Sequence, residues 1–150
     1  MAEERKVVTV LFADCVGSTG IGELLDPEEL SVVMRAFFDE MRQAIEAEGG
    51  IVEKFVGDAV MALFGVPSSH EDDPSRALRC ALSMHARMPD LNARIAPAHG
   101  VELSLRIGVN TGELLVSDDP GADLGTVTGD AVNVAARLEQ LAEPGEVVVS

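Results

Sequence analysis

The chain has 150 residues, of which 47% are hydrophobic, and this is enough for one compact domain with a real core. Its formal net charge of −15 argues against nucleic acid or an anionic membrane as a partner, because like charges repel. No stretch approaches the length of a membrane span, and the charged start MAEERKVV does not resemble a signal peptide. Cys15 and Cys80 make no disulfide framework, which suits a reducing cytoplasm.

The first part of the chain predicts a strand, a helix and a hairpin. The apolar, β-branched segment 7–13 is typical of a central strand buried on both faces. A helix follows, with Asp26 as its cap, Pro27 at the first position and Glu29 completing a capping box. Two apolar strands, 51–56 and 59–64, are joined by Gly57-Asp58, and a glycine at this place indicates a tight hairpin turn.

The second part predicts a helix with Asp73 as its cap, a strand over 103–110, and a turn at Thr111-Gly112 before ELLV continues. A helix over 130–141 and a last strand, EVVVS, complete the pattern. The order of elements favours an α+β fold, a mixed sheet of the ferredoxin or palm type with helices on one face. We expect one domain over residues 1–150.

Two aspartates are the first candidates for chemistry. Asp14 follows the central strand, and Asp58 lies at the tip of the hairpin. If the two strands are neighbours, the carboxylates share a site that suits hard cations such as Mg²⁺, as phosphoryl or nucleotidyl transfer requires. On spacing alone, ordinary turn aspartates are the better explanation of these positions, because aspartates in turns are common.

A small-residue turn, Gly17-Ser18-Thr19, follows Asp14 and offers backbone N–H groups to a polyphosphate. The competing phosphate motifs are absent from the sequence. It contains no GxxxxGK[ST] loop, no GxGxxG after a strand and no kinase catalytic loop.

A polar pair lies within the predicted last helix. Asn133 and Arg137 are four residues apart and therefore project from one helix face. Taken by itself, the pair favours an exposed polar face. An anion site is the alternative, because small apolar residues surround the pair and an arginine fork stabilises charge on phosphoryl oxygens.

The hairpin EKFVGDAVMALFG raises a question of its own, because Lys54 and Asp58 interrupt an apolar stretch. A salt bridge between the two is the simple explanation. The alternative is that each side chain serves a different partner outside the hairpin.

Three segments together resemble a known family. VLFADCVGST, EKFVGDAVMALFG and TGDAVNVAARLE, in this order and spacing, are similar to the class III nucleotidyl cyclase catalytic domain of bacterial type. The resemblance covers nearly the whole chain. A diguanylate-type cyclase is disfavoured because the GGDEF motif is missing, and Gly49-Gly50 is followed by Ile-Val.

The resemblance implies a role for each motif residue. Asp14 and Asp58, with the backbone carbonyl of Cys15, would hold two Mg²⁺ or Mn²⁺ ions. Lys54 and Thr126 would read an adenine base. Asn133 would orient the ribose and Arg137 would stabilise charge at the α-phosphate. The implied reaction converts ATP into 3′,5′-cyclic AMP and pyrophosphate in the cytoplasm.

The resemblance also implies a head-to-tail homodimer with composite sites. One protomer would supply Asp14 and Asp58, and the other would supply the remaining four residues, so a monomer is expected to be inactive. The family's domain usually extends into a further C-terminal hairpin, so we expect a longer chain with attached regulatory modules. A guanylate cyclase and a catalytically silent dimerisation or nucleotide-binding domain remain alternatives.

Overall fold

The computed structural model describes residues 3–16, 23–117 and 129–150. Five strands form one sheet in the order β2-β3-β1-β4-β5. Every neighbouring pair is antiparallel except β4 and β5, which are parallel. The mixed sheet with its helices confirms the predicted α+β class. The strands are β1 (Glu3–Val16), β2 (Ile51–Val56), β3 (Ala59–Phe64), β4 (Ser104–Ser117) and β5 (Val147–Val149).

Helix α2 (Pro27–Ala47) begins as the sequence predicts. The Asp26 side chain accepts a hydrogen bond of 2.8 Å from the Glu29 N–H, which satisfies a donor that has no partner inside the helix. Apolar residues at helical spacing turn inward, and the helix ends before Gly49, whose φ is +78°. The fully buried side chains of this stripe are Val33, Phe37, Met41 and Ile45.

Helix α3 (Asp73–His99) begins one residue earlier than the sequence predicts. Asp72 occupies the cap position, and Asp73 is the first helical residue. The Asp73 carboxylate is buried and accepts a hydrogen bond of 2.6 Å from the His70 N–H, so it closes the preceding turn instead of capping the helix.

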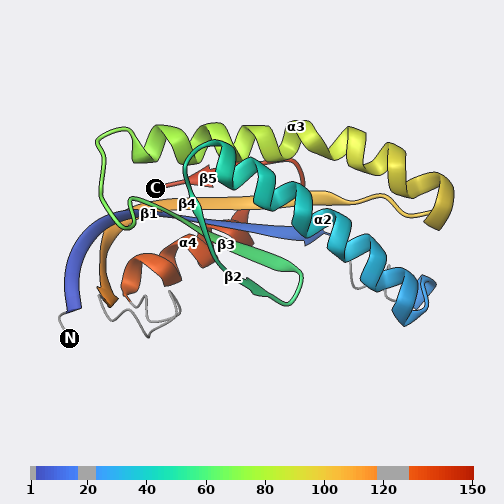
Figure 1. Ribbon diagram of the computed structural model, residues 1–150, viewed down its shortest axis with the longest axis horizontal. Helices are drawn as coiled ribbons and strands as arrows, with labels where there is room; N and C mark the ends of the chain where they lie inside the picture. Colours follow the sequence, from blue (N-terminus) through green and yellow to red (C-terminus); the bar gives the residue numbers. More distant parts are fainter. Residues whose placement is uncertain (1–2, 17–22, 118–128) are drawn as a thin grey trace.

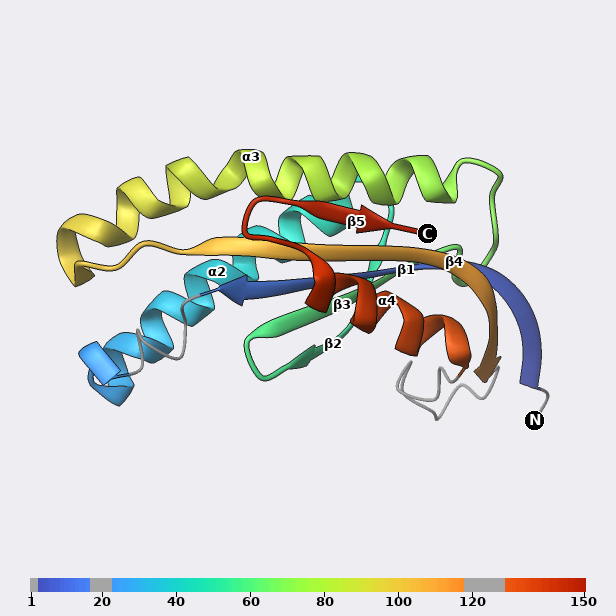
Figure 2. The same ribbon diagram turned by 180° about the vertical axis from the view of Figure 1, so that it is seen from behind.

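Helices cover both faces of the sheet, which corrects the expectation of helices on one face. Helices α2 and α3 lie together on one side, and α4 (Asp130–Leu141) lies on the other, as Figures 1 and 2 show. Two separate clusters of buried side chains match these two layers. Within the described ranges, no helix has both the length and the apolarity needed to cross a membrane.

Strand β4 continues through Thr111-Gly112, where the sequence predicted a turn. The two residues stay in register with Thr9 and Val8 of β1, and the Thr9 and Thr111 hydroxyls lie 2.9 Å apart. Glycine is needed here for space, because a Cβ at Gly112 would lie 2.8 Å from the Ala131 Cβ of α4. A close helix contact, and not a change of direction, explains this glycine.

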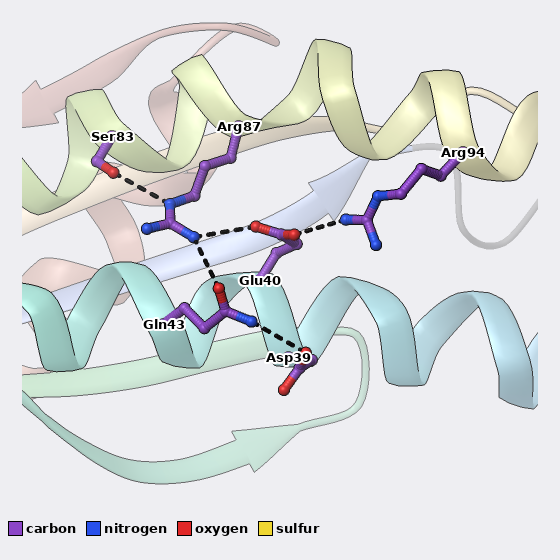
Figure 3. Close-up of polar contacts among 6 residues, drawn as sticks. All are labelled: Asp39, Glu40, Gln43, Ser83, Arg87 and Arg94. Carbon is purple, nitrogen blue, oxygen red and sulfur yellow. Dashed lines mark hydrogen bonds and ion pairs between the residues drawn. The ribbon is translucent and has the colours of Figure 1, made fainter.

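A polar cluster joins α2 to α3 on the outer side of this layer (Figure 3). The Glu40 carboxylate of α2 accepts hydrogen bonds from Arg87, at 3.0 Å, and from Arg94, both on α3. Arg87 also donates to Gln43 at 3.3 Å. The cluster fixes the position of one helix along the other, above the apolar seam that both helices bury.

Candidate active site

The pairing of β1 with β3 brings Asp14 and Asp58 together. Asp14 lies opposite Ala59, the residue next to Asp58, and the Cys15 N–H donates to the Asp58 carbonyl oxygen at 3.1 Å. Both aspartate side chains are half-buried. Gly57 has a φ of +61°, a conformation that favours glycine, and it makes the turn that ends in Asp58. Two residues 44 positions apart therefore lie at one end of the sheet.

Arg106 of β4 lies between two carboxylates at this place. Its Nη2 atom is 3.0 Å from Asp14 Oδ2 and 3.3 Å from Glu139 Oε1 of α4. The hydrogen bond with Asp14 is the main cause of a raised Arg106 pKa, and burial opposes it. One guanidinium thus connects the end of β1 to the inner face of α4.

Glu139 experiences an excess of negative charge. Its side chain is almost fully buried, and burial is the first cause that raises its pKa to about 7. A hydrogen bond to Asp14 and the charges of Asp14 and Asp58 raise the pKa further, while Arg106 lowers it. Near neutral pH, a large fraction of Glu139 therefore carries a proton.

Cys15 is a packed residue. Its side chain is 3% exposed, and burial, followed by the charges of Asp58 and Asp14, raises the thiol pKa to about 12. A thiolate nucleophile is thereby excluded at neutral pH. The buried position of the Cys15 side chain is compatible with a role for the Cys15 backbone.

Lys54 lies on the same face of the sheet as Asp14, two strands away. It pairs with Met61 of β3, which in turn pairs with Phe12 of β1, and Phe12 shares a face with Asp14. The Lys54 ammonium is 3.4 Å from the carboxylate of Glu53. The simple salt bridge with Asp58 is therefore replaced by a pair with the adjacent residue. This ion pair lies within the hairpin, and the alternative that Lys54 and Asp58 serve different partners outside the hairpin stays a prediction.

Helix α4 approaches the sheet unusually closely. A Cβ at Gly108 of β4 would lie 2.3 Å from the Glu139 nitrogen and 2.5 Å from the Ala135 oxygen. Asn110, which is buried, donates to the Ala131 carbonyl at 3.1 Å. The helix therefore presents Ala131, Ala135 and Glu139 to the sheet.

Asn133 and Arg137 lie on the opposite side of α4. Each is two residues, about 200° of helical rotation, from the residues that face the sheet. Both are exposed, and neither makes a hydrogen bond or an ion pair with another described residue. Within one chain, the structure does not bring them to Asp14 and Asp58. The remaining predicted site residues, Gly17, Ser18, Thr19 and Thr126, lie outside the described residues.

The residues at the end of β1 fit a divalent cation. Asp14 and Asp58 supply hard oxygen ligands, and the raised pKa of Glu139 reports negative charge that a cation would offset. The described parts of the chain contain no group of three His, Cys, Asp or Glu side chains arranged to hold a metal. Main-chain and substrate phosphate oxygens would have to complete the coordination.

Sequence reasoning overlooked three charged residues: Glu53, Arg106 and Glu139. Glu139 follows Ala135 by four residues on the inner face of α4, so it was detectable as a charge in an apolar helix pattern. Arg106 was not, because it alternates with the buried Leu105 and Ile107 and lies on the polar side of β4. Their partners depended on the strand register.

Comparison with known proteins identifies the family. The family model described as "Adenylate and Guanylate cyclase catalytic domain" matches residues 1–150, so the chain belongs to this family. Among solved structures, the adenylyl cyclase CyaB from P. aeruginosa is 35% identical, with a TM-score of 0.91 over 100% of this chain and 79% of that chain. The guanylyl cyclase Cya2 is 32% identical, with a TM-score of 0.93 over 100% of this chain and 77% of that chain.

The similar curated proteins are much longer than this chain. Adenylate cyclase 1 of Rhizobium meliloti (strain 1021) is 32% identical over 90% of this chain and 21% of its own length. Adenylate cyclase of Anabaena cylindrica is 31% identical over 93% of this chain and 28% of its own length. The chain thus spans about a quarter of these relatives.

Proposed function

We propose that the protein is an adenylate cyclase that converts ATP into 3′,5′-cyclic AMP and pyrophosphate. The observation that carries the proposal is the juxtaposition of Asp14 and Asp58 at the end of β1. The similarity to adenylate cyclases from three bacteria supports it. In the reaction, the ribose 3′-oxygen forms a bond to the α-phosphorus, and the bond from this phosphorus to the bridging oxygen of pyrophosphate breaks.

Asp14, Asp58 and the Cys15 carbonyl would hold two Mg²⁺ or Mn²⁺ ions. Such ions make the 3′-hydroxyl more acidic and neutralise the triphosphate. Lys54 and Thr126 would bind the base, and Gly17, Ser18 and Thr19 the phosphates. Asn133 would orient the ribose, and Arg137 would stabilise the charge that develops at the α-phosphate.

The orientation of α4 supports a site shared between two protomers. Asn133 and Arg137 point away from the sheet that carries Asp14 and Asp58, so one chain cannot present all of them to one nucleotide. A head-to-tail homodimer removes this difficulty, because α4 of one protomer can face the aspartates of the other. Two equivalent sites per dimer would result.

GTP is the second candidate substrate, favoured by the similarity to the guanylyl cyclase Cya2. The deciding experiment incubates a demonstrably dimeric preparation with ATP or GTP and Mn²⁺, and measures cyclic products by chromatography. Cyclic AMP as the main product is expected. Cyclic GMP in excess of cyclic AMP would change the assigned substrate to GTP. Absence of both products would refute the proposed cyclase activity.

Mixing two inactive variants tests the shared site. Asp58→Ala and Lys54→Ala should each lose at least about a hundredfold in activity, because one removes a cation ligand and the other a base contact. Mixed together, they should regain activity, since a heterodimer carries one intact site. Heterodimers that form but stay inactive would contradict the head-to-tail arrangement.

A further inference from the structure

A β-bulge controls which face of the sheet Lys54 occupies. In the pairing of β2 with β3, Val52 lies opposite Ala62 and Lys54 lies opposite Met61, so Glu53 has no residue opposite it. Strict alternation from Val52 would place Lys54 on the face covered by α2. The extra residue reverses the phase and sends Lys54 to the other face, the one that carries Asp14.

The same bulge directs the next residue, Phe55, to the opposite face of β2, where it packs against α2. Phe55 turns toward α2, where its ring centroid lies 4.4 Å from that of Phe38. The Arg42 guanidinium lies 5.4 Å from the centre of the Phe55 ring. The residue after Lys54 is thereby fixed, which limits how far the backbone under Lys54 can move.

The surroundings of Glu53 are energetically unfavourable for a charged carboxylate, because the side chain is buried and has few polar partners. Its side chain is 0% exposed, while that of Lys54 is 46% exposed. Among the residues that the structure describes, neither Glu53 carboxylate oxygen has a hydrogen-bond partner, and the Lys54 ammonium lies 3.4 Å from one of them. A buried charge with so few partners contributes little to stability and is often replaceable by an apolar residue without loss. Its presence beside the base-binding lysine indicates a role in that site.

We propose that Glu53 is a positioning residue that holds the Lys54 ammonium in a fixed direction for recognition of the purine base. The inference rests on the proposed function, in which Lys54 contacts the base. An ammonium group has three donors and no acceptor. The ion pair of 3.4 Å with the buried carboxylate restricts the position of the ammonium, and with it the directions in which its three donors can point.

A Lys54 ammonium held in one position distinguishes adenine from guanine better than a mobile one. A lysine on a flexible stem can follow either N1 of adenine or O6 of guanine, which are acceptors at different places on the base edge. A held ammonium meets an acceptor at one place, and guanine presents an N1–H donor where adenine presents N1. Anchoring also removes part of the side-chain entropy that the lysine would otherwise lose on binding.

The test measures nucleotide binding to Glu53→Gln by calorimetry. The probes are 3′-deoxy-ATP and 3′-deoxy-GTP with Mg²⁺, which lack the attacking hydroxyl and therefore cannot be cyclised. Glu53→Gln keeps the shape and removes the charge, so 3′-deoxy-ATP should bind roughly three- to tenfold more weakly. Binding of 3′-deoxy-GTP should change less, so the preference between the two probes falls. Glu53→Asp keeps the charge but shortens the side chain by one methylene group. Its affinity for 3′-deoxy-ATP should therefore lie between those of the wild type and Glu53→Gln.

Glu46→Gln, on the exposed side of α2, is the matched control and should leave both affinities unchanged. In a Lys54→Ala background, Glu53→Gln should have no further effect on the preference. A purely structural role would lower the melting temperature and leave the preference intact, which would overturn the proposal. An equal effect of Glu53→Gln with and without Lys54 would also overturn it. A wild type that shows the expected binding but makes no cyclic product would refute the cyclase and retain the base site.

Discussion

The single positive charge of Arg106 faces two carboxylates, Asp14 and Glu139, and cannot neutralise both. Each lies within 3.3 Å of the guanidinium, and Asp58 adds further negative charge nearby. A proton on Glu139 or a cation at Asp14 would relieve the repulsion. The site therefore stores unfavourable electrostatic energy at neutral pH, which binding of a cation would release.

The raised pKa of Glu139 predicts a pH dependence of stability. In the folded state Glu139 holds its proton up to its pKa of about 7, whereas an unfolded glutamate releases the proton near its ordinary pKa of 4.5. Stability from this group is thus fully present below pH 4.5 and is lost as the pH rises to 7. Glu139→Gln cannot ionise and still donates to Asp14. Without divalent cations, we expect it to be more stable than wild type by roughly 2 kcal/mol at pH 8 and equal at pH 4, by urea unfolding. Parallel pH profiles would contradict the assignment.

The residues of the candidate site were predictable to different degrees. Asp14, Asp58, Asn133 and Arg137 stood out because each is a polar group at a strand end, a hairpin tip or one helix face. Glu53 and Arg106 did not, because a charge within a strand is informative only when its partner across the sheet is known. Roles for all of these residues stay predictions.

At the scale of elements, the distance between α4 and the sheet depends on glycines in β4. Gly108 and Gly112 leave room for the backbone and the alanines of α4. Close contact places Glu139 beside Arg106 and directs Asn133 and Arg137 outward. A small displacement of α4 would therefore change both the Glu139 contact with Arg106 and the positions of Asn133 and Arg137.

Gly108→Ala tests this contact. Its Cβ would lie 2.3 Å from the Glu139 nitrogen, and because backbone atoms cannot turn aside, α4 must move. We expect a loss of about 3 kcal/mol in the free energy of unfolding, and of cyclase activity. Gly100→Ala is the control, since its Cβ would meet nothing within 4 Å and only its φ of +69° carries strain, which costs about 1 kcal/mol. Equal effects of the two substitutions would show that the close approach is unimportant.

The seam between α2 and α3 allows a second test of an element contact. Glu40 is 17% exposed and accepts from two arginines of α3 (Figure 3). Because both arginines are partly solvated, Glu40→Gln should cost only about 1 kcal/mol. Glu46→Gln, on the exposed side of the same helix, should cost nothing measurable. The difference in urea midpoint should shrink in 0.5 M salt, and a salt-independent difference would assign it to packing instead.

At the scale of the whole molecule, the net charge of −15 opposes self-association. If the active form is a dimer, salt should strengthen it by screening the repulsion between protomers. We expect sedimentation equilibrium to give a lower dissociation constant at about 0.3 M than at about 0.03 M salt, with activity per protomer rising in parallel at fixed protein concentration. A dimer that weakens with salt would indicate that complementary charges, and not apolar contacts, hold it together.

The sequence by itself determined the element types, the α+β class and the family. Local signals sufficed for this: apolar periodicity, the Asp26 cap, the Gly57 turn and three motifs in a fixed order. Only the packing of the whole chain decided the placement of α4 on the opposite face, the unbroken course of β4 through Thr111-Gly112, the bulge at Glu53 and the contacts of Arg106. The physical reason is that each of these depends on which residues lie opposite one another in space. A one-residue change of register at β2 moves Lys54 from one face of the sheet to the other, and no local pattern reports it.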